Sequence, residues 1–262
     1  MFDRNKKYPA CQSIRNPAGE ILFDGEWDGK SIFEVSSSIH GSEFWEGKKV
    51  LTIAANTSGL CVELARAGAQ VTACEPDPHK NNRSLVRHLL AELVEEESLS
   101  LTFLDVDFFS THKLAKSKRF SFWKPPILTE DTIIICYGLI YHFRDIVYAI
   151  EYLSSLPHAE LFISTQTQPG NNLAIFNRVD PEVLANPGFW DNYSDTVSGW
   201  HFTRKLFEAY LESAGYKDIR PLTDASINFP QKPKGLTNSA YYTASHVRQN
   251  DFKERLTQYH PR

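Results

Sequence analysis

The stretch VLTIAANTSGLCVELARAGAQVTACEPD, residues 50–77, predicts a strand, a turn of small residues, a helix and a second strand. The apolar run at 50–53 is typical of a buried parallel strand. Residues 54–59 are small enough for the backbone to approach a ligand closely. Apolar residues then repeat at helical spacing up to Gly68, a C-capping glycine, before the second strand at 71–74. This order of elements, closed by an acidic residue, builds a site for a nucleoside cofactor.

Glu75 is the acidic residue that follows the second strand. It lies about 20 residues beyond the turn, where a carboxylate can accept hydrogen bonds from both ribose hydroxyls. A Glu after a strand is usually only a solvated loop residue. The order of the surrounding elements favours the ribose role here.

Residues 50–75 resemble motif I and its acidic successor in class I S-adenosyl-L-methionine (SAM) dependent methyltransferases. The family form is close to VLDIGxGxGxLxxxLA, and the positions that the chain keeps are Val50, Leu51, Ile53, Gly59, Leu60, Glu63, Leu64 and Ala65. The resemblance implies SAM as cofactor, with Thr52, Ala54, Asn56 and Gly59 at its site.

The motif is altered at four positions. Thr52 replaces the usual Asp, Ala54 replaces the first Gly, Asn56 the second and Ser58 the third. In the family, the Asp helps to hold the ammonium end of the cofactor. Asn tolerates the left-handed region, so the change at Asn56 is mild. Ala54 and Ser58 each add a Cβ, so the loop must avoid a positive φ there or carry strain.

Length, charge and cysteine usage narrow the class of protein. A chain of 262 residues fits one α/β domain with additional segments. The net charge of -4 gives no electrostatic footprint for a polyanion, which argues against a nucleic-acid partner. Cys61, Cys74 and Cys136 fall on predicted helices or strands without metal-ligand spacing, so we expect buried free thiols and no metal. The absence of a signal peptide and of a membrane-spanning run predicts a cytoplasmic protein without a membrane partner.

We divide the chain into an N-terminal lid or cap segment at 1–48, a methyltransferase domain at 49–248 and a C-terminal tail at 249–262. The N-terminal segment ends in a predicted short helix. It either covers the cofactor or substrate, as in family members, or forms a plain surface cap. Residues 168–202 show little periodicity and are rich in Asn, Asp, Pro and Gly, which indicates an insertion over the substrate pocket.

The resemblance and the hydrophobic pattern together predict an α/β fold with a Rossmann-like class I methyltransferase sheet. The sheet is expected to be mostly parallel with an antiparallel last strand, and helices should cover both faces. Three further helices are predicted: one at 79–97, one that begins after a capping Asp145, and one at 203–214. The other predicted strands are 99–106, 132–136, 161–165, 216–222 and 240–246. The last two strands should pair like a hairpin at the edge of the sheet.

Asp105 and Asp107 follow the predicted strand at 99–106. Family members place an acidic or polar residue here, beside the adenine amino group. The alternative is an Asp that starts a turn. The order Phe-x-Asp-Val echoes the family pattern and favours Asp105 for the adenine role.

A basic and aromatic stretch occupies residues 110–126, STHKLAKSKRFSFWKPP. Such a stretch can bind phosphates and stack on bases. It more often forms a solvated helix followed by core aromatics, and we prefer that interpretation.

The strand at 132–136 delivers the segment YGLIYH, residues 137–142, to the carboxyl edge of the sheet, where ligands bind in open α/β folds. The segment resembles the strand-four motif GxLYHxxxPxxxL of the subgroup that contains the tRNA wobble-uridine carboxymethyl transferases. Gly138, Leu139 and Tyr141-His142 match, whereas Ile146-Val147 stands in place of the Pro. We assign Tyr137 to the cofactor side.

The segment SGWHFTRKLFEAYLESAGYKDI, residues 198–219, resembles the family pattern WxPTxxxLxxxLxxAGF. With the other two motifs, the resemblance extends over residues 44–222. It is specific for the fold and says little of the acceptor, because one fold hosts many acceptors.

Methyl transfer requires the lone pair of the acceptor to lie in line with the sulfur–methyl bond, and it requires a base only if a proton must leave early. His142 and His201 are the candidate bases, although each has a structural alternative in which the imidazole bonds a backbone carbonyl. Tyr141 either orients the acceptor or packs in the wall of the pocket. Four aromatic residues either line an apolar acceptor pocket or form the core of the insertion: Trp190, Tyr193, Trp200 and Phe202.

Three functions agree with these features. The preferred one is a SAM-dependent methyltransferase that modifies an oxygen or nitrogen of a small organic acceptor, as in natural-product biosynthesis. The second is a tRNA-modifying transferase of the wobble-uridine type, which the net charge disfavours. The third is a degenerate methyltransferase fold that uses SAM only as a scaffold or does not methylate, which the altered motif I allows.

Overall fold

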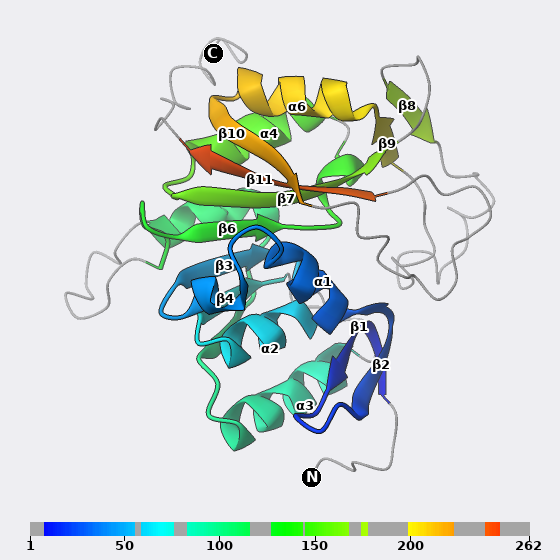
Figure 1. Cartoon of the computed structure of the whole chain (residues 1–262), viewed down its shortest axis with the longest axis vertical. Helices are drawn as coiled ribbons and strands as arrows, with labels where there is room; N and C mark the ends of the chain where they lie inside the picture. Colours follow the sequence, from blue (N-terminus) through cyan, green and yellow to red (C-terminus); the bar gives the residue numbers. More distant parts are fainter. Residues whose placement is uncertain are drawn as a thin grey trace.

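The computed structural model describes residues 8–55, 59–75, 83–115, 127–143, 145–167, 174–177, 199–222 and 239–246. The main strands of its large sheet are β3 Lys49–Ile53, β4 Gln70–Cys74, β5 Leu101–Leu104, β6 Ile133–Cys136, β7 Glu160–Thr167, β10 Tyr216–Leu222 and β11 Ser239–His246. Their order across the sheet is β10-β11-β7-β6-β3-β4-β5 (Figure 1). The strand of the altered motif, β3, therefore lies inside the sheet with a neighbour on each side.

The pairing confirms the predicted sheet. β3 runs parallel to β4 and β6, β4 runs parallel to β5, and β6 runs parallel to β7. β11 runs antiparallel to both β7 and β10. The last strand of the described chain is thus the antiparallel one, and it lies between β7 and the edge strand β10.

Helices cover both faces of the sheet, as predicted (Figure 1). One face, which we call the α2 face, packs against α1 Gly29–Ser36, α2 Gly59–Arg66 and α3 Arg83–Glu96. The other, the α4 face, packs against α4 Ile146–Ser155, α6 Arg204–Ser213 and the 3-10 segment η2 Phe108–Ala115. Two further 3-10 turns are η1 Ser42–Trp45 and η3 Ile140–His142. The alternation of side chains along each strand separates two hydrophobic cores.

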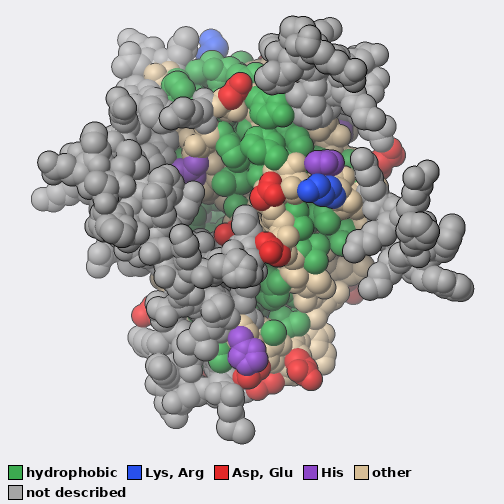
Figure 2. All heavy atoms as spheres, turned by 180° about the vertical axis from the view of Figure 1, so that it is seen from behind, with side chains coloured by type: hydrophobic (Ala, Val, Ile, Leu, Met, Phe, Trp, Pro, Cys, Tyr) green, Lys and Arg blue, Asp and Glu red, His purple; other side chains and the backbone are tan. Residues whose placement is uncertain are grey.

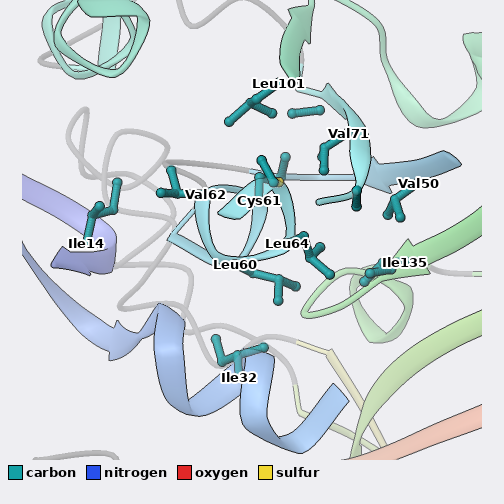
Figure 3. Close-up of a cluster of buried hydrophobic side chains, with 14 of the residues drawn as sticks. Ile14, Ile32, Val50, Leu60, Cys61, Val62, Leu64, Val71, Leu101 and Ile135 are labelled. Atoms are coloured by element: carbon teal, nitrogen blue, oxygen red, sulfur yellow. The ribbon is translucent and has the colours of Figure 1, made fainter. Parts of the chain in front are cut away.

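The core of the α2 face joins the sheet to the N-terminal segment. Leu60 and Val62 of α2 lie between Ile14 and Ile32 of that segment and the strand residues around Val71 (Figure 3). All five side chains are buried. The N-terminal segment therefore shares its core with the nucleotide-type fold.

The N-terminal segment contains two strands that the sequence analysis did not predict. β1 Tyr8–Arg15 and β2 Ile21–Asp28 form a separate antiparallel sheet with an irregular register. The short helix expected at its end is α1, and the Asp28 carboxylate accepts a hydrogen bond from the Ser31 N–H at 3.2 Å as its N-cap. Irregular pairing leaves no strict alternation in the sequence, which explains why the hairpin was missed.

Most predicted ends of helices and all predicted thiols are confirmed. Asp145 caps α4 by accepting from the Tyr148 N–H at 2.9 Å, and Gly68 ends the turn after α2 with a φ of 86°. The buried free cysteines of the described residues are Cys61, Cys74 and Cys136. Burial, followed by the nearby Cys61 and Glu75, raises the pKa of Cys74 to about 12, so this thiol stays protonated at neutral pH.

The described part of the insertion adds two short strands to the sheet. They are β8 Ala174–Asn177 and β9 Gly199–Phe202. β9 pairs parallel with the end of β7 and antiparallel with β8. The rest of the insertion, including residues 178–198, lies outside the described residues. The insertion thus returns to the carboxyl end of β7.

Neither a membrane span nor a metal cluster is found in the part of the chain that the structure describes. Its helices are too short or too polar to cross a bilayer. Its His, Cys, Asp and Glu side chains form no group of three that could hold a metal ion.

Two histidines, the buried His158 and the half-buried His246, lie at the edge of the sheet opposite to the carboxyl ends of the parallel strands. The rings of His158 and His246 stack with centroids 4.2 Å apart. His158 Nδ1 donates to the Leu156 carbonyl at 2.6 Å, which leaves Nε2 to accept from the Tyr216 hydroxyl at 3.2 Å. Burial, and then His246, lowers the pKa of His158 from 6.5 to about 3, so the imidazole is neutral at pH 7.

We expect acidification to destabilise the fold through His158. Because its pKa is about 3 in the fold and 6.5 in the unfolded chain, the unfolded chain binds one more proton between these values. This contribution is fully present above pH 6.5 and is lost as the pH falls towards 3, by up to about 1.4 kcal/mol per pH unit. Urea unfolding between about pH 7 and 5 measures the slope. The slope should be shallower in His158→Gln, and an equal slope in that variant would contradict the assignment.

Candidate cofactor and acceptor site

The candidate site lies where the parallel strands end. β3, β4, β6 and β7 are parallel, so their carboxyl ends share one edge of the sheet. The strand order reverses beside β3, because β4 follows on one side and β6 on the other. Ligands of open α/β sheets bind at such a switch point.

Ala54 adopts a backbone conformation that glycine takes more readily than alanine. Its φ is 55°, in the left-handed region, directly after β3. Ala55 N–H then donates to the Cys74 carbonyl at 3.1 Å. The turn therefore carries the strain of a Cβ at a positive φ, the second of the two outcomes expected for this position.

Thr52 faces α2. Its side chain is buried, and its hydroxyl lies 3.1 Å from Cys61 Sγ. The hydroxyl also donates to the Thr72 carbonyl at 3.5 Å. Asn56 and Ser58 lie outside the described residues.

The N-terminal hairpin packs on the first turn of α2. The Leu60 N–H, which has no partner within the helix, donates to Gln12 Oε1 at 2.8 Å. A Cβ on Gly29 would lie 2.7 Å from the Cα of Gly59, and a Cβ on Gly59 would collide with the Ser13 carbonyl oxygen. Three backbone segments therefore meet at Gly59, and only glycine fits there.

The predicted acidic residues end up in different surroundings. Glu75 is half-buried directly after β4, and its N–H donates to the Leu104 carbonyl at 3.1 Å. Asp105 is exposed at the end of β5. Asp107 accepts from the Ser110 N–H at 3.1 Å, which is the turn-starting role described above as the alternative.

The end of β6 is held by hydrogen bonds to α1 and to the neighbouring strand β7. The Tyr137 hydroxyl lies 3.0 Å from the hydroxyl of Ser36 in α1, and burial raises its pKa. Gly138 has a φ of 70°, and its N–H donates to Ser164 Oγ at 2.9 Å. The chain turns away from the sheet at Gly138 and leaves room beside the last residues of β7.

Tyr141 points towards the α2 face at this turn. A Cβ on Gly138 would lie 3.4 Å from the ring of Trp27 in β2 and 3.9 Å from the Tyr141 hydroxyl. Burial raises the pKa of Tyr241, and the neighbouring Tyr137 and Tyr141 raise it further. Trp27 and three tyrosines thus gather around the end of β6.

His142 follows on η3. Its ring lies 4.3 Å from the Tyr141 ring, centroid to centroid, and it is half-buried. Its N–H donates to the Leu139 carbonyl at 2.9 Å. His142 is therefore at the carboxyl edge and not beneath the sheet.

His201 is brought to the same edge by β9. Pairing of β6 with β7 ends at Cys136 and Ile163, and β9 pairs with the same side of β7 further on, with His201 opposite Gln166. β9 therefore continues the line of β6 beyond Gly138 and contacts η3. His201 is buried, and burial lowers its pKa, so its imidazole is neutral at pH 7.

Trp200 and Phe202 flank His201 in β9, so they point to the α4 face. Phe202 is fully buried against Phe207 and Tyr210 of α6. Trp200 stacks on Phe202 with centroids 6.1 Å apart. These contacts are core packing, the alternative considered for the aromatic residues of the insertion. Trp190 and Tyr193 lie outside the described residues.

Two residues of the edge were missed by the sequence analysis. Trp27 lies in a strand that the sequence does not predict. Gln166 lies one residue beyond the predicted end of its strand, and a polar residue at a strand end carries no distinctive signal. Only the register of β7 with β9 identifies it as a neighbour of His201.

No family model matches the sequence, and no curated protein matches it. The N-terminal domain of EvdMO1 with S-adenosylhomocysteine (SAH) bound is similar in fold, with a TM-score of 0.53 and 15% identity over 88% of this chain and 90% of that chain. A Burkholderia thailandensis 1,6-didemethyltoxoflavin-N1-methyltransferase, with bound 1,6-didemethyltoxoflavin and SAH, has a TM-score of 0.53 and 14% identity over 84% of this chain and 80% of that chain.

These likenesses agree with the strand order and helix layers described above. The chain has the Rossmann-like fold of class I methyltransferases. At such identities the likeness establishes the fold, and the chemistry must be argued from the residues at the edge.

We expect Ala54→Gly to raise the free energy of unfolding by up to about 1 kcal/mol. Removing the Cβ relieves a left-handed strain of about 1–2 kcal/mol, and the extra freedom of Gly in the unfolded chain offsets part of the gain. Urea unfolding measures the difference. In the matched control Ala55→Gly, where φ is not positive, the same change should destabilise the fold. Destabilisation in both variants would show that Ala54 is not strained.

Proposed function

We propose that the chain is a SAM-dependent methyltransferase that acts on an oxygen or nitrogen of a small organic acceptor. The observation that carries the proposal is the glycine-like turn at Ala54 at the switch point of the sheet, followed by Glu75 after the next strand. The solved structures of similar fold, crystallised with SAH, support SAM as the cofactor.

The described residues fit such a cofactor. The left-handed Ala54 turns the chain sharply at the end of β3, and the half-buried Glu75 lies at the same edge. The Leu60 N–H is already bonded to Gln12, so the first turn of α2 has one amide fewer for a ligand. We therefore assign the turn and Glu75 to cofactor binding, with Asp105 at the adenine end.

The acceptor side is the group around the end of β6. Trp27 and Tyr141 form a wall over Gly138, and His201 follows in line with β6. When bound, SAM supplies an electrophilic methyl group. The chain has to hold the acceptor in line and exclude water, which can contribute about 7–11 kcal/mol.

A base is needed when the acceptor loses a proton as it is methylated. A lone pair of the acceptor forms the new bond to the methyl carbon, and the sulfur keeps the electron pair of the broken bond. We assign the acceptor's proton to the neutral imidazole of His201, whose pKa burial lowers. His142 is the second candidate, and its tilted ring contact with Tyr141 gives it a positioning role.

The described part of the face shown in Figure 2 does not favour the tRNA-modifying alternative. The face turned away in Figure 1 carries hydrophobic and acidic side chains with few Lys or Arg among its described atoms (Figure 2). Residues 116–126, which hold most of the basic stretch, lie outside the described residues. A net charge of -4 also opposes a broad contact with phosphates.

Loss of the Glu75 carboxylate should weaken cofactor binding. We expect Glu75→Ala to bind SAH more weakly by about 1.5–3 kcal/mol, the range for hydrogen bonds to a charged group. Titration calorimetry with SAH measures the affinity. Glu95→Ala on the exposed side of α3 is the matched control and should bind like the wild type. Equal affinities in all three proteins would reject the ribose assignment, and no binding to the wild type would favour the non-methylating alternative.

Substitution of each histidine in turn distinguishes which of the two candidate bases takes the proton. With small phenols and amines as acceptors and SAH release as the readout, we expect His201→Asn to lower turnover by about 10²–10⁴-fold. His142→Asn should lower turnover less, because its imidazole orients Tyr141. Affinity for SAH and the melting temperature are measured in parallel. A large loss of turnover in His142→Asn with His201→Asn active would transfer the role of base to His142.

A further inference from the structure

Gln166 stands at the acceptor side of the edge. It is the residue before the last in β7, paired with His201 of β9 on one side and with Ser239 of β11 on the other. Paired residues of neighbouring strands point to the same face. Gln166 and His201 therefore lie side by side on the α2 face, where the Tyr141 hydroxyl also lies.

The side-chain oxygen of Gln166 is buried and has no hydrogen-bond partner among the residues that the structure describes. A buried amide oxygen without a donor costs free energy, so such atoms are rare and call for an explanation. Ser164, two residues earlier on the same face, receives the Gly138 N–H at 2.9 Å. On this face of β7, the described part of the protein thus supplies a hydrogen-bond donor to the Ser164 hydroxyl and none to the side-chain oxygen of Gln166.

Gln166 differs from a second buried polar group without a hydrogen-bond partner in the described part of the chain, the neighbouring Thr165 hydroxyl, in the face of the sheet to which it points. The hydroxyl oxygen of Thr165 also has no hydrogen-bond partner among the described residues, but it points to the α4 face. That face is filled there by the packing of β11, α4 and α6. The Gln166 oxygen instead faces the side on which Trp27 and Tyr141 meet.

Resting on the function proposed above, we propose that Gln166 Oε1 accepts a hydrogen bond from the acceptor's own O–H or N–H and so selects protic acceptors. An amide oxygen only accepts, so it has no attraction for a tertiary amine, an ether or a thioether. Gln166 holds the O–H or N–H of the acceptor in the bound complex. When the methyl group is transferred, that hydrogen bond breaks and the proton moves to the neighbouring imidazole of His201. The acceptor atom then bonds to the methyl carbon, and the electron pair of the old bond stays on sulfur. Gln166 itself exchanges neither proton nor methyl.

The test compares phenol with anisole, which differ only in whether the oxygen carries a hydrogen or a methyl group. Binding of each to the protein saturated with SAH is measured by ligand-observed NMR titration. We expect the wild type to bind phenol at least about tenfold more tightly than anisole, because anisole leaves a buried acceptor without a donor, and that cost is worth about a factor of ten or more. Gln166→Leu should bind both equally, whereas Gln166→Glu, which keeps an acceptor oxygen, should keep the preference for phenol.

Thr165→Val is the matched control, because it removes an unpaired buried hydroxyl from the other face of the same strand. It should keep the preference for phenol, and all variants should keep the affinity for SAH. A wild type that binds SAH without a preference for phenol, or a preference that survives in Gln166→Leu, would overturn the role of Gln166 alone. A wild type that does not bind SAH would overturn the proposed function instead.

Discussion

The parallel pairing of β3 with β4 on one side and β6 on the other is the constraint on which the candidate site depends. All three strands run in the same direction, so their carboxyl ends share one edge of the sheet. That edge holds the turn at Ala54, Glu75 and the segment that begins at Gly138. The chain must then turn sharply from β3 into α2, and Ala54 accepts a φ of 55° to do so. Backbone strain at this point is a consequence of keeping the switch point with an alanine in place of a glycine.

The N-terminal segment belongs to the same structural unit as the switch point. Gln12 holds the first turn of α2, Gly29 meets Gly59 at backbone distance, and Ser36 bonds to Tyr137 at the end of β6. The segment therefore contacts both sides of the switch point. Its packing on α2 also engages the Leu60 N–H at the start of that helix.

Side chains along β9 point alternately to the two faces of the sheet, which separates its polar residue from its aromatic residues. His201 points to the α2 face, towards Tyr141 and Gln166, while Phe202 packs in the core with α6. The side assigned to the acceptor thus holds an imidazole, a phenol and an amide. This set of polar groups is the basis on which a small protic acceptor is proposed.

The sequence by itself determined the parallel strands, most helix ends and the buried thiols. Apolar runs such as 50–53 and the caps at Asp145 and Gly68 can be predicted from a short window of sequence. Periodicity and capping depend only on near neighbours in the chain. The family motifs added the order of the sheet and located the edge at Glu75 and Tyr141.

Only the tertiary structure decided which side chains meet at that edge. The hairpin that carries Trp27 has an irregular register and lacks a local pattern. Gln166 and His201 lie 35 positions apart in the sequence (201 less 166) and become neighbours through strand pairing alone. The φ of Ala54 and the core position of Phe202 are likewise set by packing between distant segments, because strand register and backbone path depend on every contact of the fold.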